Sequence, residues 1–207
     1  MNVQLLDCPN KLEEKIIKDS SLYYNDINLT KSDLERFTRK CIRDENSSIF
    51  TKYVIVFKIH SIFSTYNELN HIGFNLSKPK FSFSNLNFSL PKNLQNNEKT
   101  QTVVADYLKK ISLAHNQKSH LKENFLSPDE MLLLPQICEV EYIQSENLYE
   151  CFNLCSLKEY NNISHELVSL STCIYEKLFD LYSFLFNPAT YKVFLRMKKN
   201  QKHNNYL

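Results

Sequence analysis

The segment of the sequence most informative about the fold is IFTKYVIVFKIHSIFSTY, residues 49–66. β-branched and aromatic residues dominate it, and its centre alternates with a period of two, as a strand with one buried face does. The two alternating sets are Val54, Val56, Lys58 and His60 on one side and Ile55, Phe57, Ile59 and Ser61 on the other. We therefore expect a β-strand over 49–66, in which His60 is a core or edge histidine rather than a general base.

Two further segments carry the same period. Residues 81–90, FSFSNLNFSL, alternate, slip by one position and alternate again, which predicts a bulged strand or a hairpin. In residues 138–142, Cys138, Val140 and Tyr142 alternate with two glutamates, as in a short strand with one exposed face. The sequence therefore predicts a small antiparallel sheet within residues 1–114 and one short strand beyond it.

Helical spacing accounts for much of the remaining chain. Helices are expected at 11–18, at 30–44 with a capping box from Thr30 to Asp33, at 102–114, at 127–135, and from Ser145, as the N-cap, to about 157. A long helix follows at 164–186, and Pro188 is placed to begin a last, basic helix. The predicted fold class is α+β, with N-terminal helices and a small antiparallel sheet followed by a mainly helical C-terminal part.

Polar connections suggest a division of this chain into two domains. The polar segment 115–122 is the expected linker between an α+β domain at 1–114 and a mainly helical domain, with one short strand, at 123–200. Residues 201–207 are expected to form a disordered tail.

The long helix predicted at 164–186 is apolar over an unusually wide face. One seam recurs at spacings of three and four residues, and Tyr175, Phe179, Tyr182 and Phe186 form a second seam beside it. A helix with so wide an apolar face lies at the centre of its own domain or contacts another chain, and we favour contact with a protein partner. The residues predicted to bind that partner are Leu167, Leu170, Ile174, Leu178, Phe179, Leu181, Tyr182 and Leu185.

Composition excludes several classes of enzyme. Gly73 is the sole glycine, so the glycine-rich loops that cradle phosphates and the nucleophile elbow are absent. The spacing of Cys151, Cys155, His165 and Cys173 fits no zinc-finger or knuckle pattern, and their apolar neighbours favour buried free thiols. We expect no catalytic residues, no metal, no cofactor and no small-molecule substrate.

Charge is distributed unevenly along the chain. Residues 1–122 carry a net charge of +6, residues 123–180 carry −9, and residues 181–207 carry +5. The N-terminal residues lack the apolar region of a secretory signal, and no stretch is long and apolar enough for a membrane span. With cysteines that read as free thiols, these features predict an intracellular protein, nuclear or cytoplasmic, with no membrane association.

Taken together, the sequence predicts a non-catalytic subunit of a multiprotein assembly, a hetero-oligomer in the cell, with chromosomes as one expected setting. The alternative is a single-stranded nucleic-acid-binding protein of small-barrel type that uses strands within 50–90 and the basic C-terminus. A third hypothesis, a cysteine-dependent or metal enzyme, predicts bound zinc or one highly reactive thiol. The residues that would bind nucleic acid in the alternative are Phe81, Phe83, Phe88, Lys192, Arg196, Lys198 and Lys199.

Overall fold

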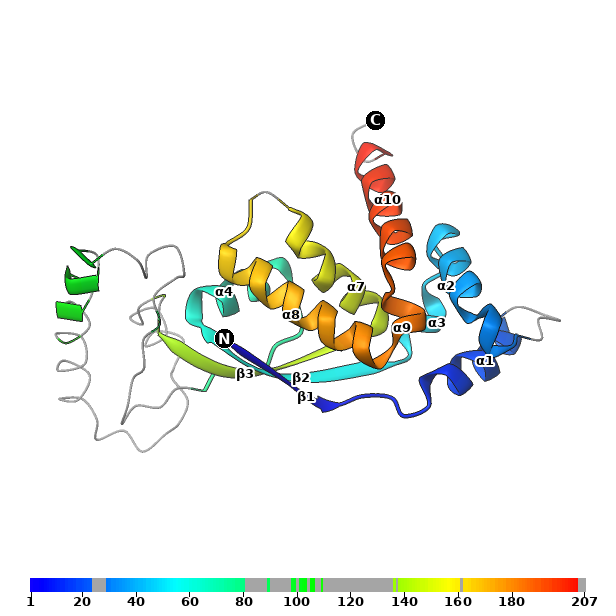
Figure 1. The fold of residues 1–207 in the computed structure, drawn as a ribbon, viewed down its shortest axis with the longest axis horizontal. Coiled ribbons are helices and arrows are strands. Elements are labelled where there is room, and N and C mark those ends of the chain that lie inside the picture. The colour runs from blue at the N-terminus through cyan, green and yellow to red at the C-terminus, as the bar shows by residue number, and fades with distance from the viewer. Residues whose placement is uncertain are drawn as a thin grey trace. The chain divides into compact units, whose positions relative to one another are not determined.

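The protein has an α+β fold with a three-stranded antiparallel sheet (Figure 1). The computed structural model describes residues 1–23, 29–80, 89, 98–99, 101–103, 105–106, 109, 136, 138–160 and 162–204. The strands are β1 (Asn2–Asp7), β2 (Val54–Ile62) and β3 (Glu139–Asn147). The helices are α1 (Leu12–Tyr23), α2 (Leu34–Arg43), α3 (Ser48–Thr51), α4 (Phe63–Ile72), α7 (Leu148–Ser156), α8 (His165–Leu181), α9 (Ser183–Phe186) and α10 (Pro188–Asn204), with 3₁₀ turns at Lys31–Asp33 and Leu157–Glu159.

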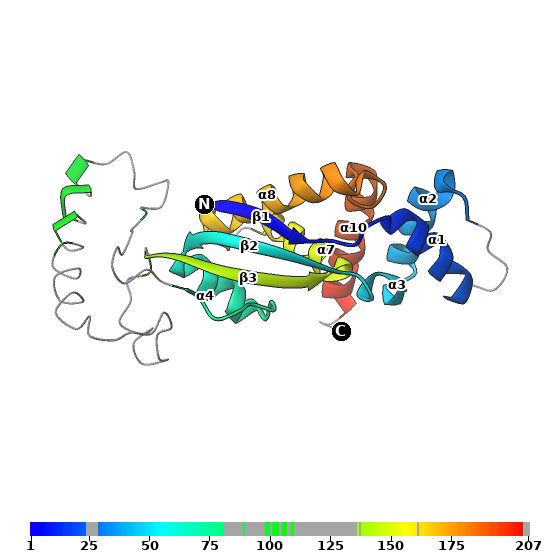
Figure 2. The same cartoon turned by 90° about the horizontal axis from the view of Figure 1, so that it is seen from below.

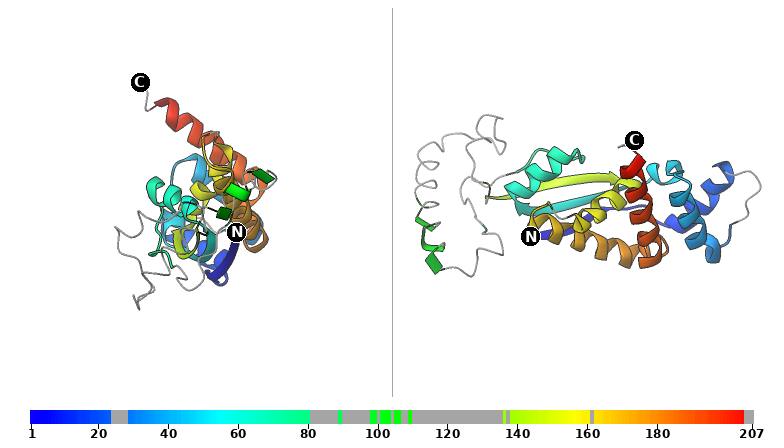
Figure 3. Two further views of the ribbon diagram at one scale, coloured as in Figure 1. Left: turned by 90° about the vertical axis from the view of Figure 1, so that its left-hand side faces the viewer. Right: turned by 90° about the horizontal axis from the view of Figure 1, so that it is seen from above.

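β2 is the central strand of the sheet, between β1 and β3. Figures 2 and 3 show β2 and β3 running alongside each other over most of their length. The predicted alternation of β2 is confirmed, because Ile55, Phe57 and Ile59 are buried whereas Lys58 and His60 are partly exposed. The exposed face carries two cross-strand pairs, Lys58 Nζ with Glu141 Oε2 at 2.9 Å and His60 Nε2 with Glu139 Oε2 at 3.7 Å.

The predicted strand over 49–66 is too long at both ends. Residues 48–51 form α3, and the chain turns helical at Phe63, where α4 begins. The spacing explains α4, because Phe63, Tyr66 and Leu69 recur every three residues and all three are buried on one face. Gly73 ends α4 in the left-handed conformation, at φ 99°, which glycine adopts without steric cost.

The strand predicted at 138–142 is confirmed and is longer than expected. Cys138, Val140 and Tyr142 are buried, and the alternation continues through Gln144, so that β3 reaches Asn147. The expectation that Ser145 caps the next helix is therefore wrong. Asn147 caps α7 instead, since its side-chain oxygen accepts a hydrogen bond from Glu150 N at 2.9 Å.

The chain folds into two compact units that interleave along the sequence. One unit comprises Met1–Leu6, Val56–Ser145 and Asn162–Leu170, and the other comprises Asp7–Ile55, Glu146–Asn161 and Ser171–Leu207. Strand β3, which lies beyond the predicted linker at 115–122, pairs with β2, which lies before it. The linker itself, the predicted hairpin at 81–90, the helix at 127–135 and most of the helix at 102–114 lie outside the described residues.

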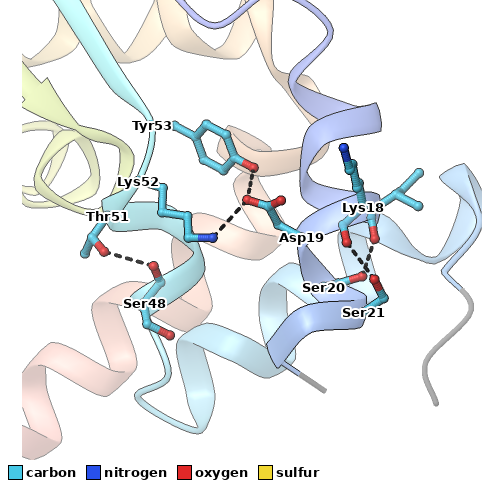
Figure 4. A network of polar contacts seen from close by, with 9 residues as sticks. Lys18, Asp19, Ser20, Ser21, Ser48, Thr51, Lys52 and Tyr53 are labelled. Atoms are coloured by element: carbon cyan, nitrogen blue, oxygen red, sulfur yellow. Dashed lines mark hydrogen bonds and ion pairs between the residues drawn. The ribbon is translucent and has the colours of Figure 1, made fainter. Parts of the chain in front are cut away.

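The second unit is built around an aromatic core. The ring of Phe152 in α7 stacks on Phe186 of α9 at 4.4 Å and on Phe194 of α10 at 5.2 Å between centroids. Helix α2 packs against α10, α1 against α3, and α3 against α7. A polar link joins α1 to the residues after α3, because Asp19 Oδ2 accepts hydrogen bonds from Lys52 Nζ at 3.2 Å and Tyr53 Oη at 2.9 Å (Figure 4).

The long helix predicted at 164–186 ends earlier than expected. α8 stops at Leu181, Tyr182 leaves the helical conformation at φ −135° and ψ 56°, and α9 follows as a separate short helix. The break at Tyr182 is stabilised by its hydroxyl, which donates to Pro9 O at 2.9 Å. The prediction that Pro188 begins the last helix is confirmed, and α10 continues to Asn204, into the segment expected to be a disordered tail.

Candidate interaction surfaces

The start of α8 is fixed by a side-chain cap. Ser164 Oγ accepts a hydrogen bond from Leu167 N at 3.2 Å, as an N-cap serine does, and donates to the Glu68 carboxylate of α4. Glu68 also accepts from Ser164 N at 3.2 Å, and its negative charge lies at the positive end of the helix dipole. The two side chains line an open depression beside α4, and their hydrogen bonds to each other stabilise α8.

The residues predicted to bind a partner are divided between the interior and the surface. Within the part of the chain that the structure describes, Phe179 is 38% exposed and Leu181 is 45% exposed. The wide apolar face of α8 is thus covered mainly by the protein itself. The predicted residues that are buried are Leu167, Leu170, Ile174, Leu178, Tyr182 and Leu185.

Phe179 lies at the end of a stack of side chains. Its ring is 6.4 Å from that of Tyr175, and the Tyr175 ring is 5.0 Å from that of Tyr191 in α10. The Lys158 ammonium lies 3.7 Å from the centre of the Tyr175 ring and 4.8 Å from that of Tyr191, within cation–π range. Burial raises the pKa of both tyrosine hydroxyls.

A hydroxyl hydrogen bond fixes the base of this stack. Tyr191 Oη donates to Cys155 O at 2.9 Å, which joins α10 to the end of α7. Ser171 Oγ of α8 donates to the same carbonyl at 2.8 Å. The aromatic residues under Phe179 are therefore held by both packing and hydrogen bonds.

The basic residues predicted in the last helix are mostly at the surface. Lys192, Arg196 and Lys199 are exposed on α10. Lys198 instead lies over two rings, 5.7 Å from the centre of Phe194 and 5.9 Å from that of Tyr149. Phe81, Phe83 and Phe88, the other residues of the nucleic-acid alternative, lie outside the described residues, so that part of the hypothesis stays a prediction.

Sequence reasoning missed a second basic row, on α2. Arg36, Lys40 and Arg43 are exposed there, on the side opposite to the buried residues of the helix. The signal was present in the spacing of these residues, which recur after four and three positions as one face of a helix requires. The spacing alone does not predict that α2 packs against α10.

The cysteines of α7 are buried and poorly suited to chemistry. Burial raises the pKa of the Cys155 thiol to about 12, and it raises that of Cys151 well above its ordinary value. Cys173 of α8 is only partly buried. Among the residues described, no three His, Cys, Asp or Glu side chains gather as a metal site would require.

No protein-family model matches the chain, and no curated protein is significantly similar to it in sequence. In the part of the chain that is described, every helix is too short or too polar to cross a bilayer.

Proposed function

We propose that this chain is a non-catalytic subunit of an intracellular multiprotein assembly and that it binds a protein partner at Phe179 of α8. The observation that carries the proposal is an exposed phenylalanine whose ring is supported by the near-parallel ring of Tyr175, one turn earlier in α8. Interface residues that contribute most to binding are typically aromatic side chains that lose little conformational freedom when the partner arrives. A supported ring of this kind fits that description.

The charged residues near Phe179 indicate the chemical character of the partner's surface. Glu176 and Asp180 are exposed on the same helix, within three residues of Phe179, and residues 123–180 as a whole have a net charge of −9. Complementary charge at the rim of an interface favours encounter and specificity. The partner is therefore expected to offer an apolar pocket for the ring with basic residues around it.

Leu181, the other exposed residue of the predicted set, lies apart from Phe179. Residues two positions apart lie on different sides of a helix, so Leu181 does not extend the surface around Phe179. A partner that contacts both residues has to reach around the C-terminal end of α8. The variants Phe179→Ala and Leu181→Ala consequently test two different parts of the interface.

The test compares partners of the tagged protein purified from its own cells at high salt. We expect Phe179→Ala to weaken retention of the partners by about 30-fold or more, since an interface residue of this type contributes about 2 kcal/mol or more. Ile72→Ala, which removes an apolar side chain of α4 that is 48% exposed, is the control. Retention that is unchanged by Phe179→Ala, in a protein that folds normally by circular dichroism, contradicts the proposal.

A further inference from the structure

We propose that the outward faces of α2 and α10 form one basic surface that binds the phosphate backbone of double-stranded nucleic acid. The two helices pack against each other within one compact unit. Figure 1 shows α10 rising next to α2. The proposed surface does not include Phe179, so it is independent of the protein partner proposed above.

The face that α2 turns to solvent is cationic. Leu34, Phe37 and Cys41 are buried and anchor the helix. The opposite side holds Arg36, Lys40 and Arg43, all exposed. Of the acids nearby, Glu35 is paired with Arg39, with 3.3 Å between Oε2 and Nη1. Hydrogen bonds from Thr30, and to a smaller extent the charge of Arg36, lower the pKa of the Asp33 carboxyl group. Asp44 and Glu45 are exposed beyond the C-terminal end of the helix and leave the face itself without an acid.

Helix α10 presents a similar row. Tyr191, Phe194 and Met197 are buried, whereas Lys192, Arg196 and Lys199 are exposed at spacings of four and three residues. No acidic residue occurs in the sequence of α10, from 188 to 204. The three cations therefore have no carboxylate on their own helix to neutralise them.

The type and the position of these residues both favour phosphate binding. All four arginines of the sequence are on these two helices, at positions 36, 39, 43 and 196. Arginine's planar fork of donors matches the oxygens of a phosphate. Cations in the last turn of a helix also complement its dipole, but Arg36, Lys192 and Arg196 lie too far from the C-terminal ends of their helices for that role.

The shape and composition of the surface favour duplex nucleic acid over other polyanions. From Lys192 to Lys199 the helix rises about 10 Å, which is comparable to the rise of about three base-pair steps along the axis of a duplex. The exposed positions of the two described faces carry no aromatic ring on which unpaired bases would stack and no large apolar side chain to enter a lipid bilayer. Contacts to the backbone alone imply binding with little sequence preference.

The experiment measures fluorescence anisotropy of a short labelled DNA duplex of mixed sequence with the full chain, over a series of salt concentrations. We expect the logarithm of the binding constant to fall linearly with the logarithm of salt concentration, with a slope of about −0.9 for each phosphate contacted. The double variants Lys40→Gln/Arg43→Gln and Arg196→Gln/Lys199→Gln should each reduce the magnitude of this slope by about 1.8. These residues are exposed, so the substitutions should leave the fold intact.

Charge-matched controls distinguish this surface from a general attraction. Lys15→Gln/Lys18→Gln removes two exposed lysines of α1, and it should leave the slope unchanged. An equal loss in this control overturns the proposal, as does the absence of duplex binding at roughly 50 mM salt. Tighter binding of a single strand of equal charge would overturn the assignment to duplexes. Equal competition by polyglutamate would overturn it in favour of an acidic protein.

Discussion

At the scale of single residues, the ring of Phe152 holds together three helices of the second unit. Its stacking distances to Phe186 and Phe194 are short, and all three side chains are fully buried. Truncating such a residue removes its transfer free energy and leaves a cavity. We expect Phe152→Ala to lower the free energy of unfolding by about 3–5 kcal/mol, measured by urea denaturation.

Phe179→Ala is the matched control for that measurement. The same atoms are removed from a ring that is partly in water already, so the loss should be within about 1 kcal/mol. If Phe152→Ala proves too unstable to purify, Phe152→Leu gives a smaller loss in the same direction. Equal costs at the two positions would contradict the packing described for the core.

The buried thiols make stability dependent on pH in the alkaline range. The pKa of Cys155 is raised from 9.0 to about 12 in the folded protein, so its contribution to stability is complete below about pH 9 and is lost as pH rises through 12. We expect the free energy of unfolding to fall from pH 9 to pH 11 in the wild type. The fall should be shallower in Cys155→Ala, because the unfolded state then loses one fewer proton.

Ser169→Ala, which removes no ionisable group, is the reference for this titration. Its pH profile should parallel that of the wild type. A profile of Cys155→Ala that also parallels the wild type would show that Cys155 ionises equally in both states, against the burial described.

The sequence pattern predicted which side chains are buried where burial depends on a single helix or strand. The alternation of Ile55, Phe57 and Ile59 was sufficient to assign the buried face of β2. The exposure of Phe179 was not predictable, because it depends on which helices cover α8, and no local pattern specifies tertiary packing.

At the scale of the element, α8 depends on the cap at its first turn. Ser164→Ala removes the acceptor for Leu167 N and leaves the Glu68 carboxylate without the hydroxyl hydrogen bond. We expect a loss of about 1 kcal/mol in the free energy of unfolding, typical of an N-cap serine. Urea denaturation measures it, with Ser169→Ala in the interior of the same helix as the control.

An equal loss of free energy of unfolding in Ser164→Ala and Ser169→Ala would contradict the role of Ser164 as an N-cap. Ser169 lies after the first turn, so its hydroxyl does not satisfy a backbone N–H group that the helix leaves unpaired. Serine also has a lower helix propensity than alanine, so Ser169→Ala should be neutral or slightly stabilising.

Element boundaries were less predictable than the elements themselves. The helical spacing of Leu167 to Leu185 continues across Tyr182 without a glycine or a proline, yet the helix is interrupted there. The interruption accompanies a hydrogen bond from the Tyr182 hydroxyl to Pro9, which is remote in sequence. Ser145 fails as a cap for a similar reason, because strand pairing extends past it.

At the scale of the whole molecule, the sheet is assembled from segments far apart in the sequence. β2 pairs with β1 on one side and with β3 on the other. A fragment of residues 1–114 lacks β3 and so loses one neighbour of its central strand. We expect this fragment to show no cooperative unfolding transition by circular dichroism, because two strands seldom form a stable sheet.

This fragment also tests the division into domains at 115–122 that the polar segment suggested. A cooperative transition in the fragment, with a slope in urea appropriate to its size, would support that division and contradict the dependence on β3. The full chain, measured in the same way, supplies the reference.

The candidate surfaces were predictable in part. The exposed apolar and basic residues of α8 and α10 are among those chosen from the sequence. The basic row on α2 gained significance only from its packing against α10, because the two helices are separated by most of the chain. A surface that combines segments distant in the sequence can be recognised only from the tertiary structure.

A subunit of a multiprotein assembly, as we propose for this protein, is bound to other chains in its cells. The native mass of the tagged protein from its own cells, with its co-purifying partners, should be determined at low and at high salt. We expect a defined set of protein partners that remains bound at high salt, at a mass well above 24.5 kDa. A lone chain at the monomer mass under both conditions would contradict it.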